Sequence, residues 1–473
     1  MAEYSLQEIF EAQQRSFAGD VNPGWAARDG RLARLAMMTE MHGDDIAAAI
    51  SADFSHRSLH ETALAEVFVV LSGINHARSH LKAWMKTRRV GTKLHFFPGY
   101  SRIMRQPLGV VGIISPWNYP FQLAIAPAIG AIAAGNRVLI KPSETVPNFS
   151  ALLKQIIGDF FPPEELAVVE GDVAVAGEFA RLPFDHLFFT GSTTVGRQVA
   201  QAAAQNLTPL TLELGGKSPA IIDASCDYLL AAPRLMAGKL LNAGQTCIAP
   251  DYLLLPAASA DREEELAALL VTAAARLYPR LADNSDYTSI ISARHFDRLE
   301  GLLEDARAKG ARVMEINPGK EVFTRQSRKL PPHLVLGATE EMAVMQEEIF
   351  GPILPVMRVS SLAAAIAFLN RRPRPLALYW FGQDSGNRDE VLGKTIAGGV
   401  SINDTLLHVA QEELPFGGVG ASGYGEYHGE RGFLSCSKEK PVFLQRRFAA
   451  TSLLYPPYGK TFARVMAVLR RLA

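Results

Sequence analysis

Cys247 lies in the segment Asn-Ala-Gly-Gln-Thr-Cys-Ile, where small neighbours such as Gly244 would let a substrate approach the sulfur. A cysteine acts as a nucleophile when its thiol is deprotonated and accessible. Taken alone, however, a cysteine flanked by Ala, Gly and Ile is more often a small core residue. The chemical interpretation of Cys247 therefore depends on other residues.

Glu213 stands in an apolar stretch, Leu-Glu-Leu, that ends at Gly215 and Gly216. A carboxyl group in apolar surroundings has a raised pKa and can accept a proton near neutral pH. This pattern makes Glu213 a candidate general base. The alternatives are an exposed strand residue or an ion pair with Lys217.

Asn118 lies in Pro-Trp-Asn-Tyr-Pro, directly after the apolar run Val-Val-Gly-Ile-Ile-Ser. Two prolines restrict the turn, and an amide held at the carboxyl end of a buried strand can stabilise an oxyanion without reorganising. An asparagine chosen only for turn geometry is the alternative interpretation.

A glycine-containing turn at residues 189–196, Phe-Thr-Gly-Ser-Thr-Thr-Val-Gly, separates a strand-like run from a helix-like run. A helix amino terminus after a strand is suited to binding the phosphates of a dinucleotide. The fingerprint GxGxxG occurs instead at Gly418, Gly420 and Gly423. It follows a Pro-Phe-Gly turn and precedes no helical pattern, so we predict a loop there.

The helices and strands that position these residues can be predicted from the spacing of apolar residues along the chain. Residues 6–84 have helical patterns, whereas from Gln106 short apolar runs alternate with Ala-rich helical stretches. Such alternation predicts βαβ units around a buried parallel sheet, and hence an α/β fold. The apolar stretch 121–135 contains Pro127 and Gly130 and is too short to span a bilayer, so we predict a buried helix.

Composition limits the class of protein. A chain of 473 residues predicts two or three domains, and 48 basic residues balance 48 acidic ones, which disfavours nucleic acid as a partner. Three widely spaced cysteines indicate neither a disulfide framework nor a metal site. The amino terminus lacks the pattern of a secretory signal. A cytoplasmic location is expected, with no transmembrane segment.

The final segment, residues 461–472, mixes apolar and basic residues at helical spacing, as a membrane-surface helix would. We favour a terminal helix that docks on its own protein and keep membrane contact as the less favoured alternative.

Seven motifs together resemble the aldehyde dehydrogenase superfamily, in that family's order: PWNYP, IKPSE, FTGSTTVG, LELGGKSP, GQTC, EEIFGP and LPFGGVGASG. Each motif is weak alone, but the ordered set, from about residue 109 to 432, is specific. The spacing of Glu213 and Cys247 also matches the family. The short amino-terminal arm, HETALAEV and YHGERGF are similar to the class 3 branch, in particular to coniferyl-aldehyde dehydrogenases.

The resemblance implies roles for individual residues. Cys247 would be the nucleophile, Glu213 the base, and Asn118 with the Cys247 N–H the oxyanion hole. NAD would be the cofactor, with NADP also open, because a Glu144 carboxylate beside the ribose would repel a 2′-phosphate whereas Lys141 could offset this. The residues expected at the cofactor are Pro116, Trp117, Lys141, Glu144, Gly191, Ser192, Gly196, Glu348 and Phe350. Tyr119 and His408 are expected to line the substrate pocket, although both could equally be packing residues.

The resemblance also implies three parts and a homodimer. A dinucleotide-binding domain would comprise residues 1–90 and 107–212, and a catalytic domain residues 213–400. An oligomerisation arm would comprise residues 91–106 and 401–447, followed by a tail at 448–473.

The expected reaction is oxidation of an aldehyde to a carboxylate through a thioester. Coniferyl-type aromatic or medium-chain aliphatic aldehydes are the favoured substrates. The alternatives are a CoA-acylating aldehyde dehydrogenase, against which Glu213 argues, and a cofactor-binding protein of the same fold without turnover.

Overall fold

A six-stranded sheet organises the first half of the chain. The computed structural model describes residues 5–257 and 262–472. The strand order of this sheet is β15-β7-β6-β3-β4-β5, and every neighbouring pair is parallel except β15 with β7. The bounds are β3 Val110–Ile114, β4 Arg137–Lys141, β5 Leu166–Val168, β6 His186–Gly191, β7 Leu210–Leu214 and β15 Gly423–Tyr424.

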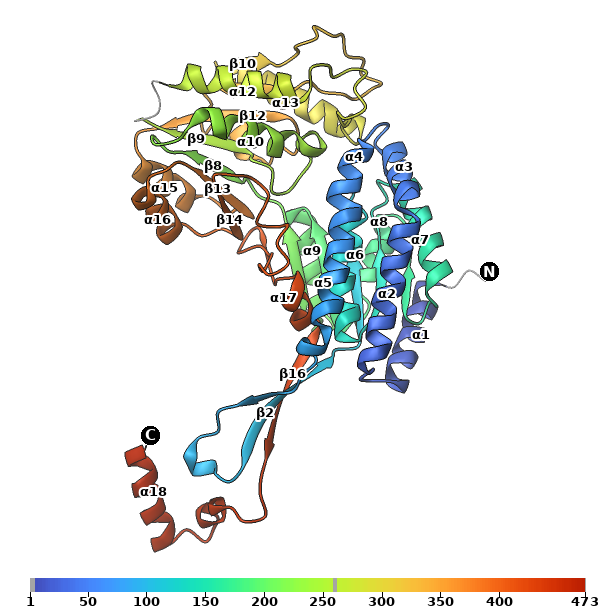
Figure 1. The fold of residues 1–473 in the computed structure, drawn as a ribbon, viewed down its shortest axis with the longest axis vertical. Helices are drawn as coiled ribbons and strands as arrows, with labels where there is room; N and C mark the ends of the chain where they lie inside the picture. The colour runs from blue at the N-terminus through green and yellow to red at the C-terminus, as the bar shows by residue number, and fades with distance from the viewer. Residues whose placement is uncertain (1–4, 258–261, 473) are drawn as a thin grey trace.

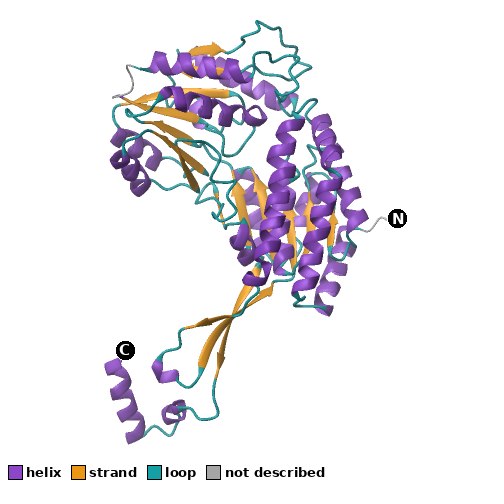
Figure 2. Cartoon of the chain, viewed as in Figure 1, coloured by secondary structure: helices purple, strands orange, loops and turns teal. Residues whose placement is uncertain are grey.

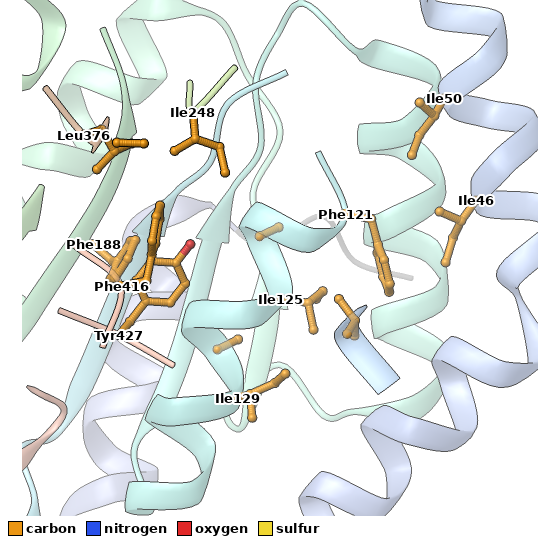
Figure 3. Close-up of a cluster of buried hydrophobic side chains, with 14 of the residues drawn as sticks. Ile46, Ile50, Phe121, Ile125, Ile129, Phe188, Ile248, Leu376, Phe416 and Tyr427 are labelled. Atoms are coloured by element: carbon orange, nitrogen blue, oxygen red, sulfur yellow. The ribbon is translucent and has the colours of Figure 1, made fainter. Parts of the chain in front are cut away.

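Helices cover this sheet and confirm the helical prediction for residues 6–84 (Figure 1). The predicted buried helix is α6, which packs against α2 and α5 on one side and against the sheet on the other. Figure 3 shows Phe121, directly before α6, and Ile125 and Ile129 of α6 in the same apolar cluster as Ile46 and Ile50 of α3. The bounds are α1 Leu6–Gly19, α2 Trp25–Met41, α3 Gly43–Asp53, α4 Leu59–Thr62, the π-helical turn η1 Ala63–Phe68, α5 Val69–Trp84, α6 Gln122–Ala134, α7 Pro147–Phe160, α8 Val173–Ala180 and α9 Thr193–Ala204.

A second, seven-stranded sheet has the order β10-β11-β12-β9-β8-β13-β14, with only β10 antiparallel to its neighbour. Both large sheets are thus mainly parallel and flanked by helices, which confirms the predicted α/β fold (Figure 2). The bounds are β8 Pro219–Ile222, α10 Tyr228–Leu240, η3 Leu241–Gly244, β9 Tyr252–Pro256, α12 Glu263–Leu277, α13 Ala293–Ala308, β10 Arg312–Glu315, β11 His333–Leu336, α14 Ala343–Gln346, β12 Ile353–Val359, α15 Leu362–Arg371, β13 Ala377–Phe381, α16 Ser385–Lys394 and β14 Gly399–Ile402.

A third, antiparallel sheet projects from the rest of the chain (Figure 1). Its long strands pair from Ser437 opposite Pro107 to Leu444 opposite Tyr100. The bounds here are β1 Arg88–Val90, η2 Leu94–Phe96, β2 Tyr100–Pro107, α17 Gly429–Ser435, β16 Ser437–Leu444, η4 Ala450–Leu454 and α18 Lys460–Leu472.

The terminal helix α18 stands away from the body of the chain (Figure 1). No residue from 461 to 471 is buried, so the prediction that this helix docks on its own protein is wrong for the chain as described. Its basic residues favour solvent, and its apolar residues find too little surface within the chain to cover them. No helix in the described residues is both long enough and apolar enough to cross a membrane.

Gly418 and Gly420 of the GxGxxG pattern lie in a loop, as predicted, whereas Gly423 begins β15, the short strand that closes the edge of the six-stranded sheet. Gly423 lies opposite Glu213 of β7, at a φ of 126°. A Cβ atom at Gly423 would lie 1.9 Å from the carbonyl oxygen of Leu212. The glycine is therefore required for close backbone contact with β7.

Candidate functional site

A cavity of about 280 Å³ lies where the carboxyl ends of β3, β6 and β7 meet the second sheet. In an open parallel sheet, residues that follow neighbouring strands meet at one edge, where ligands usually bind. The cavity brings together nine of the fourteen residues selected from the sequence. These are Pro116, Trp117, Asn118, Gly191, Ser192, Glu213, Cys247, Glu348 and Phe350.

Glu213 points from β7 into this cavity with only 2% of its surface exposed. Neither carboxylate oxygen has a hydrogen-bond partner among the described residues. Burial, with a smaller contribution from the charge of Glu426, raises the pKa of Glu213 well above its usual value. Such a carboxyl group can hold or accept a proton near neutral pH.

Cys247 is half-buried and faces the same cavity, just beyond η3. Desolvation, followed by the charges of Glu348 and Glu213, raises the pKa of its thiol to about 12. The thiol is therefore protonated at neutral pH, and attack by the sulfur requires a proton acceptor. Two carboxyl groups in the same cavity are available for this.

The backbone before Cys247 has an unusual conformation. Asn242, Ala243 and Gly244 all have positive φ angles, of 52°, 50° and 77°. A Cβ atom at Gly244 would lie 2.3 Å from the carbonyl oxygen of Gly351, so this position accepts only glycine. Buried Glu61 holds the strained turn by accepting a hydrogen bond from the Asn242 N–H at 3.0 Å.

Asn118 and the cysteine loop are joined directly. The Nδ2 of Asn118 donates to the Gln245 carbonyl at 3.1 Å, and the Nδ2 of Asn242 donates to the Asn118 carbonyl at 2.9 Å. The side chain of Gln245 in turn donates to Ser289 and accepts from the Ile291 N–H. Because an amide has two N–H donors, Asn118 keeps one donor for a ligand in the cavity.

A buried ion pair between the loop before α4 and the π-helical turn η1 supports the Asn118 turn. Arg57 and Glu66 lie 2.8 Å apart with both side chains fully buried. Arg57 Nη1 donates to the Asn118 carbonyl at 2.8 Å, and Glu66 Oε2 accepts from the Phe121 and Gln122 N–H groups at the start of α6. This support was not predicted from the sequence. The only signal was two acids, Glu61 and Glu66, within an otherwise apolar stretch.

Glu348 and Phe350 also line the cavity. A Cβ atom at Gly215 would lie 2.1 Å from Glu348 Oε2, so the glycine after β7 gives this carboxylate room. Burial, then the charge of Asp251, raises the pKa of Glu348 to about 8, and its Oε1 has no hydrogen-bond partner within the described chain. Phe350 has a φ of 53° and contacts Trp117 edge-on at 5.4 Å.

Lys141 and Glu144 lie together beyond the carboxyl end of β4, outside the cavity lining. Lys141 is buried, donates to the Pro142 carbonyl at 2.8 Å and lies 3.9 Å from the exposed carboxylate of Glu144. Gly196 is buried in α9, and a Cβ atom there would lie 2.6 Å from Leu214. Its contribution is the close packing of α9 against β7.

Tyr119 and His408 also lie outside the cavity lining. The hydroxyl of buried Tyr119 is 2.7 Å from Thr246 Oγ1, and the Arg57 guanidinium stacks on its ring at 4.8 Å. Tyr119 thus ties the Asn118 turn to the residue before Cys247. His408 is buried behind Phe416, 2.8 Å from Ser401 Oγ, and burial lowers its pKa to about 4. The contacts of Tyr119 and of His408 are typical of packing residues, which was the alternative to a place in the substrate pocket.

The remaining cavity residues escaped the sequence analysis. Most are apolar or aromatic, and even those that lie within the quoted motifs carry no chemical group that distinguishes them from core residues. Phe416 and Tyr427 form one such aromatic wall, with ring centroids 5.6 Å apart (Figure 3). The others are Leu123, Thr190, Leu214, Gly215, His295, Arg298 and Leu376.

Comparison with known proteins gives consistent results. The family model described as "Aldehyde dehydrogenase family" matches residues 5–442. A "Probable coniferyl aldehyde dehydrogenase" of Pseudomonas aeruginosa is 49% identical, over 98% of this chain and 95% of that protein. A "Coniferyl aldehyde dehydrogenase" of a Pseudomonas species is 44% identical, over 99% of this chain and 97% of that protein.

The solved structures include a close match to the whole fold. The substrate-bound state of Staphylococcus aureus AldH has a TM-score of 0.92 and 38% identity, and the match covers 99% of this chain and 100% of that one. Because the family model spans most of the chain and these relatives align along nearly their full length, this protein belongs to the aldehyde dehydrogenase family.

Proposed function

We propose that this chain oxidises an aldehyde to a carboxylic acid with NAD(P) through a thioester on Cys247, which water activated by Glu213 then hydrolyses. One observation carries the proposal: a thiol, an unpartnered buried carboxyl group and an amide with a free N–H, from three distant segments, line one cavity. These groups match the nucleophile, base and oxyanion donor that acyl transfer requires.

The first step is attack of the Cys247 sulfur on the aldehyde carbon, while the thiol proton passes to a carboxyl group of the cavity, Glu213 or Glu348, and from there to solvent. The Asn118 amide and the Cys247 N–H stabilise the developing oxyanion. NAD(P), when bound, accepts the hydride whose loss turns the adduct into a thioester. Glu213 then removes a proton from water, which attacks the thioester and releases the acid.

The cavity wall fits a nicotinamide nucleotide. The free Oε1 of Glu348 is an acceptor for ribose hydroxyl groups, and the rings of Trp117 and Phe350 offer a flat apolar surface. At the distal end, Glu144 favours NAD because its exposed carboxylate repels a 2′-phosphate, although Lys141 at 3.9 Å offsets part of that charge.

Glu213→Gln tests the proposal. Glutamine keeps the shape of the side chain but cannot take a proton from water, whereas Glu348 can still accept the thiol proton, so we expect a burst of reduced cofactor followed by slow turnover. In the unsubstituted chain, the slow rate should increase with pH up to the raised pKa of Glu213, because only the deprotonated carboxylate is a base. The variant should lose this increase.

Stopped-flow and steady-state absorbance of the reduced cofactor measure both phases. Adding CoA distinguishes hydrolysis from the alternative, CoA-acylating reaction. In a CoA-acylating enzyme the thiol of CoA would increase the steady-state rate. Unchanged steady-state turnover in Glu213→Gln would overturn the role of Glu213.

The substrate we propose is an aromatic aldehyde of the coniferyl type. The relatives named for coniferyl aldehyde support this choice, as do the rings of Phe416 and Tyr427 in the cavity wall. Specificity constants for cinnamyl, benzyl and medium-chain alkyl aldehydes, each with NAD and NADP, test it. A preference for alkyl aldehydes would contradict it.

We also propose that the chain forms a homodimer through the projecting sheet and tail. Large apolar side chains are unusually exposed there, and such patches mark protein contacts. Light scattering after size exclusion would give the mass, and a monomer at micromolar concentration would refute the proposal. The residues concerned are Leu94, Phe96, Phe97, Phe443, Phe448, Leu453, Tyr455, Tyr458 and Val468.

A further inference from the structure

A cluster of two histidines and one carboxylate lies outside the cavity already described. His76 and His80 are one turn apart on α5, and their rings stack with centroids 4.2 Å apart. Glu413 approaches from the loop before Phe416, with its Oε1 3.5 Å from His76 Nε2. One ligand atom from each of the three residues lies within 4.8 Å of the other two.

The histidines are arranged as metal ligands usually are. His80 Nδ1 lies 2.9 Å from the His76 carbonyl, a contact that places the proton on Nδ1 and leaves the Nε2 lone pair free. Metal-binding histidines commonly donate their second N–H to a backbone carbonyl in this way.

The surroundings hold the histidines in place and leave Glu413 adaptable. Trp84 packs against both imidazole rings, at 5.8 and 5.9 Å. Glu413 is 79% exposed and free to turn toward an ion, whereas the carboxylate of neighbouring Glu412 accepts a hydrogen bond from the Gly429 N–H. Three protein ligands with room for solvent are typical of an open zinc site.

We propose that His76, His80 and Glu413 bind one divalent transition-metal ion, such as Zn²⁺, through two imidazole nitrogens and a carboxylate oxygen, with water in the remaining position. Imidazole ligands select Zn²⁺, Cu²⁺ and Ni²⁺ over Mg²⁺ and Ca²⁺, which require mainly oxygen ligands. The ion would join α5 to the loop that leads to Phe416 in the cavity wall. This site is independent of the three cysteines, from which the sequence predicted no metal.

Zn²⁺ titration of the chelator-treated, full-length protein tests the proposal by calorimetry. The Cys247→Ala chain serves as the background, because the cavity thiol could itself bind the ion. We expect one ion per chain, with affinity at least tenfold lower in His80→Ala and in Glu413→Gln. His60→Ala is the matched control, because His60 also pairs with an acid, Asp286, at 2.9 Å, but belongs to no such three-residue cluster among the described residues.

A second measurement separates ligand loss from misfolding. Co²⁺ replaces Zn²⁺ and reports its coordination by visible absorption, and the melting temperature without metal shows whether each variant folds. The expected result is a Co²⁺ spectrum that His80→Ala loses while its metal-free melting temperature stays the same. Absence of binding in the Cys247→Ala background, or equal affinity in His80→Ala and His60→Ala, would overturn the proposal.

Discussion

The cavity region and the projecting sheet use charge in opposite ways. Around the cavity, charged groups such as Arg57 and Glu66 are fully buried and each contacts backbone groups of the Asn118 turn. On the projecting sheet, most charged side chains are solvated and large apolar ones are exposed, and only toward the body of the chain is one, Arg105, largely buried. A buried charge is stable only when its partners are in place, so the cavity region is specified by a few irreplaceable contacts. The projecting sheet depends on strand pairing that tolerates substitution.

The largest expected effect is that of Cys247→Ala, which removes the proposed nucleophile. We expect turnover to fall to background while the fold is retained, because alanine fits where a half-buried cysteine did. Cofactor reduction measures the loss. Cys436→Ala is the control, since Cys436 lies outside the cavity lining and should keep turnover; normal oxidation by Cys247→Ala would contradict the assignment.

Arg57→Met should destabilise the fold by about 3–5 kcal/mol, because it leaves the Glu66 carboxylate buried without its partner. Turnover should fall as well, since the Asn118 carbonyl loses its donor. Denaturant unfolding measures the free energy. The control is Arg78→Met, because the partner of Arg78, Asp29, is partly exposed. An equal loss of unfolding free energy in the two variants would contradict the contrast between buried and solvated charged groups.

Asn118→Ala should raise the barrier to thioester formation by about 2.7–4 kcal/mol, a slowing of roughly a hundredfold or more, because one oxyanion donor is lost. The burst rate of cofactor reduction measures this step. Asn118→Asp keeps the shape but removes the donor and should be similarly slow. A burst as fast as that of the unsubstituted chain would show that the amide only shapes the turn.

The smallest effect is expected on the projecting sheet. Arg446→Ala removes an exposed guanidinium that stacks on Tyr100 at 5.3 Å, and we expect a change in unfolding free energy within about 0.5 kcal/mol. Chemical denaturation at low protein concentration measures it. A larger loss of unfolding free energy would mean that exposed charged side chains on this sheet stabilise the fold more than we expect for solvated groups.

Much of the candidate site could be predicted because its residues are local chemical signals. Glu213, Cys247 and Asn118 each stand in a short motif, and the alternation of strands and helices predicted the parallel sheet that positions them. The packing of Tyr119 against Thr246 and of His408 behind Phe416 could not be predicted, since an aromatic residue beside a motif looks the same whether it faces a cavity or the core.

The sequence by itself determined the family and the α/β class and supplied the candidates for the reactive side chains, because periodicity and short motifs are properties of neighbouring residues. Only the tertiary structure decided which distant groups support them. Glu61 accepts a hydrogen bond from Asn242, 181 residues later in the sequence, and so stabilises the turn before Cys247. Glu413 likewise contacts His76, which lies in an amino-terminal helix. It also decided that α18 stands exposed. Such contacts depend on how the sheets and helices pack, and no local pattern records that packing.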